Sequence, residues 1–270
     1  MPADPAPPVL PGAIRPDWPA PESVSALMST RAGGVSAPPF DSLNLRPAGL
    51  PGDAVDEPAA VAENQRRFAA ALGAEPVWLD QVHGADVVRL TRADTAPGRG
   101  FLRADASIST EPGVGCVVLV ADCLPVLLCS RDGGVVGAAH AGWRGLAAGV
   151  LERSVAAMCA AAGCGPDQLL AWLGPCIGPR QFEVGADVLA AFGADPAAPD
   201  ATHFIPRPRS DGSPRWLANL AQLARDKLGA AGVTAVTGGG WCTVEDGSRF
   251  FSFRRDRVTG RLAAGLARRG

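Results

Sequence analysis

The chain has 270 residues, of which 47% are hydrophobic and 19% are charged, a composition typical of a soluble globular protein. Its formal net charge of −2 argues against a protein that binds nucleic acid or a membrane surface through bulk positive charge. A local basic pocket for a phosphate is still compatible with this charge. The sequence has no apolar run long enough to span a bilayer, so we expect no transmembrane helix.

The sequence has seven cysteines and shows no secretory signal, which would combine a basic segment with an apolar one. An odd number of cysteines without such a signal favours reduced thiols over a disulfide framework. We therefore expect a cytoplasmic protein in which most cysteines are small buried hydrophobic residues. A monomer is expected as well.

Residues 1–20 are rich in proline and alanine and are expected to form a flexible N-terminal arm, and residues 21–270 to form a single catalytic domain. Helical spacing of apolar residues predicts helices over residues 57–72, 144–162, 186–192 and 217–231. Short apolar runs predict strands over residues 24–30, 87–91, 106–109, 116–121, 126–129, 135–139, 169–173, 233–236 and 250–253. This mixture predicts one layered domain with mixed β-sheets.

Two histidines and one cysteine occupy unusual positions. His140 and Cys123 each follow an apolar strand, and His83 precedes a glycine. Taken singly, each has an ordinary interpretation as a buried or surface residue. Together they supply three ligands for a tetrahedral zinc ion with an open fourth position, or a thiolate nucleophile flanked by imidazoles. Their spacing along the chain does not by itself show that they converge.

Four further polar residues are candidates for substrate binding. Arg31 precedes two glycines and suits a phosphate or carboxylate, the alternative being a solvated arginine at a turn. Arg144 lies one turn from His140 and can hold an anion or cap its own helix. The amides of Asn44 and Gln81 suit a base edge or a sugar hydroxyl, or equally the backbone of their own loops.

Other polar residues near these segments have simpler interpretations. We expect Asp122 to be structural and, if it lies on a strand, to point away from Cys123. Cys176 is expected to pack in the core, and His203 to lie on the surface. The glycines at positions 142 and 145 are expected to let a ligand approach backbone N–H groups.

Seven segments resemble, in the same order, the motifs of the YfiH-like family. They are Ser29–Val35, Asp80–Gly84, Ala104–Ala106, Ala121–Val126, Ala139–Gly145, Gly174–Gly178 and Phe251–Arg255. The family has been described as polyphenol oxidase or multicopper laccase-domain proteins and, more recently, as purine nucleoside phosphorylases.

The resemblance implies a three-layer α/β/α single domain with mixed β-sheets, the YfiH-like fold. It also implies a centre at His83, Cys123 and His140 that can hold zinc. This chain departs from the family in having no tyrosine, with Val244 and Phe253 where relatives often carry an aromatic residue and a tyrosine. These departures alter the polarity of the pocket and leave the three candidate ligands in place.

The function implied by the resemblance is purine nucleoside phosphorolysis, with zinc-dependent adenosine deamination as an additional activity. The partners would be a purine nucleoside and phosphate. One alternative is a peptidoglycan-precursor editing hydrolase that acts on UDP-muramoyl-L-Ser. Another is a weak phenol oxidase using copper, although three histidines are too few for a multicopper site. A non-enzymatic alternative is a metal-binding module with Cys176 or Cys242 as a fourth ligand.

Overall fold

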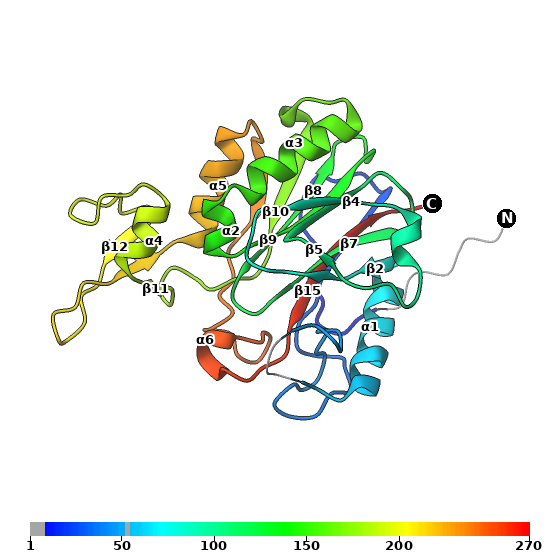
Figure 1. The fold of residues 1–270 in the computed structure, drawn as a ribbon, viewed down its shortest axis with the longest axis horizontal. Helices are drawn as coiled ribbons and strands as arrows, with labels where there is room; N and C mark the ends of the chain where they lie inside the picture. The colour runs from blue at the N-terminus through cyan, green and yellow to red at the C-terminus, as the bar shows by residue number, and fades with distance from the viewer. Residues whose placement is uncertain (1–8, 52–54) are drawn as a thin grey trace.

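The computed structural model describes residues 9–51 and 55–270, and two β-sheets packed face to face form its centre (Figure 1). The first sheet has four strands in the order β1 (Val24–Met28), β15 (Leu262–Arg268), β7 (Val114–Val120) and β2 (Glu75–Val77). The second has six, in the order β14 (Ala235–Gly238), β10 (Leu169–Leu173), β8 (Leu124–Ser130), β9 (Val136–Ala141), β6 (Ala106–Ser109) and β4 (Val87–Leu90). Both sheets mix parallel and antiparallel pairs.

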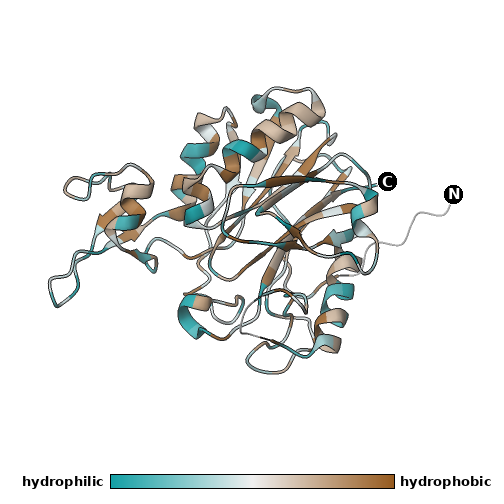
Figure 2. Ribbon diagram, viewed as in Figure 1, coloured by the Kyte–Doolittle hydropathy of each residue, from teal (hydrophilic) through white to brown (hydrophobic). Residues whose placement is uncertain are grey.

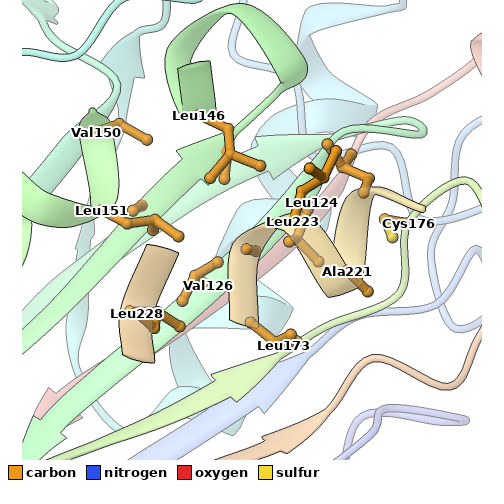
Figure 3. Close-up of a cluster of buried hydrophobic side chains, with 14 of the residues drawn as sticks. Leu124, Val126, Leu146, Val150, Leu151, Leu173, Cys176, Ala221, Leu223 and Leu228 are labelled. Carbon is orange, nitrogen blue, oxygen red and sulfur yellow. The ribbon is translucent and has the colours of Figure 1, made fainter. Parts of the chain in front are cut away.

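Helices cover the outer faces of this double layer. Helix α1 (Pro58–Leu72) packs on the four-stranded sheet through Phe68 and Leu72. Three helices pack on the six-stranded sheet, namely α2 (Trp143–Ala147), α3 (Val150–Ala162) and α5 (Leu220–Ala230). Figure 3 shows their leucines and valines meeting side chains of the sheet. The predicted α/β class with mixed sheets in a single domain is confirmed, and its β layer is double.

The strands are buried on both faces, which accounts for their continuous apolar sequences. All seven residues of β7 are buried, and its side chains alternate between two cores because successive residues of a strand face opposite sides. Cys116, Val118 and Val120 lie between the two sheets, whereas Val117 and Leu119 face helix α1. Accordingly, the central strands are the hydrophobic part of the ribbon in Figure 2.

Smaller elements surround the centre. A three-stranded sheet, β11 (Glu183–Val184), β13 (Trp216–Ala218) and β12 (Phe204–Pro206), lies with α4 (Ala186–Ala191) at one end of the molecule (Figure 1). The remaining elements are β3 (Leu79–Asp80), β5 (Leu102–Arg103), α6 (Phe253–Asp256) and two short 3-10 helices, Arg92–Thr95 and Pro166–Gln168. Among the described residues, no helix is both long and apolar enough to cross a membrane.

Most predicted elements are present, with shifts of a few residues at their ends, and three differ. The helix predicted over residues 144–162 is two helices, α2 and α3, because Gly149 between them has a φ of 92°. The helix predicted over residues 217–231 begins later, at Leu220, since residues 216–218 form β13. The strand predicted over residues 250–253 is wrong: Ser252 caps helix α6 there, accepting a hydrogen bond from the Arg255 N–H at 3.2 Å.

Strand β15, in the middle of the four-stranded sheet, was not predicted from the sequence. It pairs with both β1 and β7, yet its residues are mostly small and have low strand propensity. The packing explains their size. A Cβ atom on Gly265 would lie 3.0 Å from Val117 and 3.2 Å from the Phe68 ring, so a larger side chain would collide with helix α1 and its neighbouring strand.

The expected N-terminal arm falls partly on residues 1–8, outside the described residues. From residue 9 onwards the segment contacts the domain. Leu10 is buried, and Ile14 exchanges two backbone hydrogen bonds with Met28, each 2.8 Å long. The boundary at residue 20 remains a prediction.

Buried Asn64 on α1 organises the loop that follows β1. Its Nδ2 donates to Ser36 Oγ at 2.9 Å, to the Ser42 carbonyl at 3.1 Å and to the Asn44 carbonyl at 3.0 Å. Its Oδ1 accepts from the Val35 N–H at 2.9 Å. One amide thus fixes four points of a loop that would otherwise bury unpaired polar groups.

We predict that Asn64→Asp lowers the free energy of unfolding by about 2 kcal/mol or more, because a carboxylate of the same shape cannot donate to three buried oxygens. Urea unfolding measures the change. The control is Gln65→Glu on the same helix, where one 3.2 Å hydrogen bond to the Leu45 carbonyl is lost from a half-buried side chain. An unchanged unfolding midpoint for Asn64→Asp would show that the amide does not hold the loop.

Candidate active site

His83, Cys123 and His140 lie together although they are far apart in the chain. The ring of His140 projects from β9, Cys123 lies in the turn between β7 and β8, and His83 follows β3. Their ligand atoms all lie within 4.8 Å of one another. Cys123 Sγ is 3.8 Å from His83 Nε2, and the two imidazole rings meet edge to face with centroids 4.8 Å apart.

Fully buried Asp105 orients both histidines. Its Oδ2 accepts the N–H groups of Val82 at 3.1 Å and Gly84 at 2.7 Å, and its Oδ1 accepts the His83 N–H at 2.9 Å. The same Oδ1 is 2.7 Å from His140 Nδ1. His83 has a φ of 60°, an uncommon conformation for a residue with a side chain, and these bonds hold the turn in it. With Nδ1 of His140 engaged, its Nε2 is the nitrogen available at the site.

Asp122 shapes the turn that carries Cys123. It has a φ of 93°, and its carboxylate accepts hydrogen bonds from the Thr243 hydroxyl and the Arg254 N–H, both at 2.6 Å. Its carbonyl accepts the Ile177 N–H at 2.8 Å. Asp122 is therefore structural, as expected, but it lies in a turn with a positive φ and not on a strand.

The two glycines after His140 leave room for the site's own residues. A Cβ atom on Gly142 would lie 3.0 Å from Cys123 Sγ and 3.1 Å from the His83 ring. One on Gly145 would lie 2.5 Å from the Gly84 carbonyl oxygen. These distances show that the glycines let helix α2 approach the His83 turn, and the expectation that they admit a ligand to backbone N–H groups stays a prediction.

Cys123 and His140 form a coupled acid–base pair. Burial by itself would raise the pKa of the Cys123 thiol, but the charge of His140 and hydrogen bonds to both histidines outweigh it and lower this pKa to about 6. Burial would lower the pKa of His140, yet the charge of Cys123 and the hydrogen bond that His140 donates to Asp105 raise it to about 9. By contrast, burial raises the pKa of Cys116 and of Cys129 to about 12. Cys123 is therefore the activated thiol of these three.

The three residues open onto a cavity of about 480 Å³, within the range of small-molecule sites. Gln81 and Arg144, which were predicted from the sequence, also line it. Gln81 forms two hydrogen bonds with the backbone of Leu119, of 2.9 and 2.7 Å. The guanidinium of Arg144 is exposed and lies 4.4 Å from the centroid of the Trp143 ring. Further lining residues include Arg46, Asp80, Asp122, Phe182, Phe253, Arg254 and Arg261.

Arg31 and Asn44 are not brought to the lining of this cavity. The guanidinium of Arg31 lies 3.2 Å from the Asp41 carboxylate and donates to the carbonyls of Asp41 and Gly247 at 2.9 and 3.0 Å. Asn44 is 2% exposed, and its amide oxygen accepts the N–H groups of Arg46 and Arg261. Both side chains are occupied with contacts of the protein itself.

The other residues considered from the sequence lie where we expected them. Cys176 is buried in the core beneath the helices (Figure 3). His203 is partly exposed and pairs with Asp226 and Asp200, far along the chain from the three clustered residues.

The roles of Asp105 and of the cavity arginines Arg46, Arg254 and Arg261 were not predicted from the sequence. Asp105 stands in the family-like segment Ala104–Ala106, directly before a buried strand. An acidic residue at such a position could have indicated a functional role. Arg254 likewise stands in the segment Phe251–Arg255, whereas Arg46 and Arg261 lie outside the seven segments and folding alone brings them to the cavity.

The donors of the cluster fit a metal ion. A thiolate and two imidazole nitrogens are the ligands that zinc prefers. The separation of 3.8 Å between Cys123 Sγ and His83 Nε2 is close to the roughly 3.5 Å expected between two such ligands of a tetrahedral ion. Among the described residues, this is the one group of three or more histidine, cysteine or acidic side chains with metal-binding spacing.

Residues 25–269 match the family model described as multi-copper polyphenol oxidoreductase laccase. The chain belongs to this family. A purine nucleoside phosphorylase of Pseudomonas aeruginosa is 53% identical over 251 residues, covering 93% of this chain and 96% of that relative. The purine nucleoside phosphorylase YfiH of Escherichia coli is 50% identical over 253 residues, with the same two coverages, 93% and 96%.

Solved structures of the family have the same fold. A Neisseria meningitidis protein superposes with a TM-score of 0.82 at 43% identity, covering 96% of this chain and 99% of that one. YlmD from Geobacillus stearothermophilus superposes with a TM-score of 0.80 at 32% identity, covering 92% and 93%. The resemblance seen in the sequence motifs therefore extends over the whole domain.

We predict that, in protein stripped of metal by a chelator, alkylation of Cys123 by iodoacetamide accelerates as pH rises through about 6 and then levels off. The reason is that the thiolate is the reacting form. Mass spectrometry of the peptides gives the rate at each pH. Partly exposed Cys159, whose pKa is raised by burial and by Cys164, is the internal control and should react appreciably only in much more alkaline solution than Cys123. Parallel pH profiles for both cysteines would contradict the assignment.

Proposed function

We propose that this protein is a purine nucleoside phosphorylase, which converts adenosine, inosine or guanosine and phosphate into the free base and ribose 1-phosphate. The observation that carries the proposal is the thiol–imidazole cluster, which opens onto a cavity of nucleoside dimensions lined by several arginines. The relatives that are similar over almost the full chain bear this name.

Phosphorolysis makes two demands that the cavity residues suit. A phosphate oxygen forms a bond to the anomeric carbon of ribose while the bond to the purine nitrogen breaks, so the phosphate must be held in place and the leaving base must receive a proton. Cationic side chains of the cavity suit the first demand. The pair of Cys123 and His140, kept in orientation by Asp105, suits the second when it is free to exchange protons.

We further propose that His83, Cys123 and His140 hold zinc, with copper as an alternative occupant. Three protein ligands leave one position open, as in catalytic zinc sites. The chemistry that zinc supplies in such a site is Lewis-acid activation of water, which the hydrolytic deamination of adenosine requires. Gln81 and Arg144, on the wall of the same cavity, would contact the nucleoside.

Two features argue against a multicopper oxidase. The sequence has three histidines, and one of them, His203, is paired with Asp226 and Asp200. A site with several copper ions needs many more imidazole ligands.

The seven cysteines are free thiols, which agrees with a cytoplasmic location, where thiols remain reduced.

We predict that purified protein releases free base from inosine only when phosphate is present, and that Cys123→Ala lowers this rate about 100-fold or more, because the activated thiol is lost. Chromatography of products with and without phosphate measures both. Adenosine converted to inosine without phosphate reports deamination. The matched control is Cys164→Ala, a partly exposed cysteine that is not among the residues lining the cavity. Unchanged turnover in Cys123→Ala would remove this residue from the mechanism.

A second candidate, amide hydrolysis, is favoured by the order of contacts Cys123, His140 and Asp105. A thiolate beside an imidazole that a carboxylate orients is an arrangement used for nucleophilic attack on carbonyl carbon. Release of L-Ser from UDP-muramoyl-L-Ser, with no reaction of nucleosides, would establish this activity in place of the first.

The metal proposal gives a prediction for Asp105. Asp105→Asn is expected to weaken zinc binding about 10- to 100-fold, because the group that orients both ligating histidines is lost. Competition with a chromogenic chelator measures the dissociation constant. Asp86→Asn is the control, since this exposed carboxylate forms, within the described part of the chain, a single long contact of 3.7 Å with Arg153. Equal affinities for Asp105→Asn and the unmodified protein would show that Asp105 does not support the metal site.

A further inference from the structure

Two arginines from opposite ends of the chain meet at the wall of the cavity that contains Cys123. Arg261 immediately precedes β15 and is partly buried. Its Nη1 donates to the carbonyls of Thr259 and Gly260 at 3.1 and 3.2 Å. Within residues 9–51 and 55–270, no carboxylate forms an ion pair with Arg261. Its charge is therefore only partly compensated by neutral carbonyl groups.

Asn44 fixes the backbone of both arginines. Its Oδ1 accepts the Arg46 N–H at 3.2 Å and the Arg261 N–H at 2.9 Å. The orientation of the amide is set because its Nδ2 donates to the Asp56 carboxylate at 3.0 Å. Asn64 supports this arrangement by donating to the Asn44 carbonyl. The two side chains thus start from one buried anchor and enter the same cavity.

Arg46, whose guanidinium donates to the carbonyls of Leu50 and Pro51 at 2.9 and 2.7 Å, adds positive charge to the surroundings of Arg261. The pKa of Arg261 is lowered, first by burial and then by the positive charge of Arg46, while Cys123 and Asp122 act in the opposite direction. Confining the Arg261 cation away from water, without a carboxylate paired to it among the described residues, is unfavourable unless an anion joins it. The arrangement is therefore suited to a site completed by a bound oxyanion.

The other arginines are less suited to this role. Arg31 is already paired with Asp41. Arg144 is exposed and stacked on Trp143. Arg254 is exposed and donates to the Glu183 carbonyl at 3.3 Å. Of the four, Arg261 combines partial burial, the lack of an ion-paired carboxylate among the described residues and a position on the cavity wall.

We infer that Arg261, with Arg46 beside it, is the binding site for the phosphate co-substrate. A guanidinium presents two parallel N–H groups that match two oxygens of a phosphate. Asn44 is a positioning residue, acting through the two backbones it holds. The identity of the anion rests on the proposed phosphorolysis, whereas the anion site itself rests on Arg261 and its surroundings.

The test measures binding of inorganic phosphate to the full-length protein by isothermal titration calorimetry, with and without inosine. Arg261→Met is expected to raise the Kd of phosphate about 10- to 100-fold, as loss of a hydrogen-bonded charge implies. In steady-state assays the KM for phosphate should rise by a similar factor, with a much smaller change in the KM for inosine. Arg261→Lys keeps the charge and loses the two parallel N–H groups. Its Kd for phosphate should lie between those of the unmodified protein and Arg261→Met.

The matched control is Arg225→Met. Arg225 is also partly buried and its guanidinium also donates to two carbonyls, those of Val236 and Gly238, but it is not among the residues lining the cavity. The Arg225→Met variant should bind phosphate with the same Kd as the unmodified protein. If Arg261→Met does not fold, Arg261→Lys decides, because a Kd equal to that of the unmodified protein would overturn the assignment.

The remaining outcomes separate the two proposals. Phosphate binding that survives in Arg261→Met and is lost in Arg31→Met would place the anion at Arg31 and overturn the inference. The absence of phosphate binding by the unmodified protein, both with and without inosine, would also overturn it. Arg261-dependent binding of phosphate without cleavage of any purine nucleoside would contradict the proposed function and leave the anion site standing.

Discussion

The carboxylate of Asp105 receives three backbone N–H groups from residues 82–84 and contacts the imidazole of His140. A buried carboxylate is stable only when its oxygens are well supplied with donors, and here the donors are the elements that carry the active site. The same contacts hold His83 in its left-handed conformation and fix which nitrogen of His140 faces the cavity. The acid–base properties of Cys123 then follow, because its thiolate is stabilised by an imidazole that Asp105 orients.

The double sheet determines where these residues can meet. The turn between β7 and β8 connects the four-stranded sheet to the six-stranded one, and Cys123 lies in that turn. Asp122 binds the turn to Thr243 and to the backbone of Arg254, both from later parts of the chain. Small residues complete the assembly: Gly142 leaves space for the thiol and the His83 ring. A larger residue at this position would separate the groups whose proximity defines the site.

The cavity has two chemically different sets of side chains, a thiol–imidazole cluster and a group of arginines. The thiol–imidazole cluster can bind a metal ion or exchange protons. Arg261 and Arg46, held through Asn44, provide positive charge that is suited to an oxyanion. Arg31, by comparison, lies within the family-like segment Ser29–Val35, but its guanidinium donates to the carbonyls of Asp41 and Gly247. A short motif therefore identifies an arginine, whereas its contacts determine what that arginine binds.

The sequence by itself determined most of the buried strands, helix α1 and the identity of the three candidate residues of the cluster, because apolar periodicity and local motifs are properties of neighbouring residues. Only the tertiary structure decided the place of β15, whose small residues give no strand signal and are required by contacts with Val117 and Phe68. It also decided the roles of Asp105, Asn44 and Arg261, since each depends on a partner distant in the chain. Hydrogen bonds and charge compensation are made between groups that folding brings together, and the order of residues does not specify them.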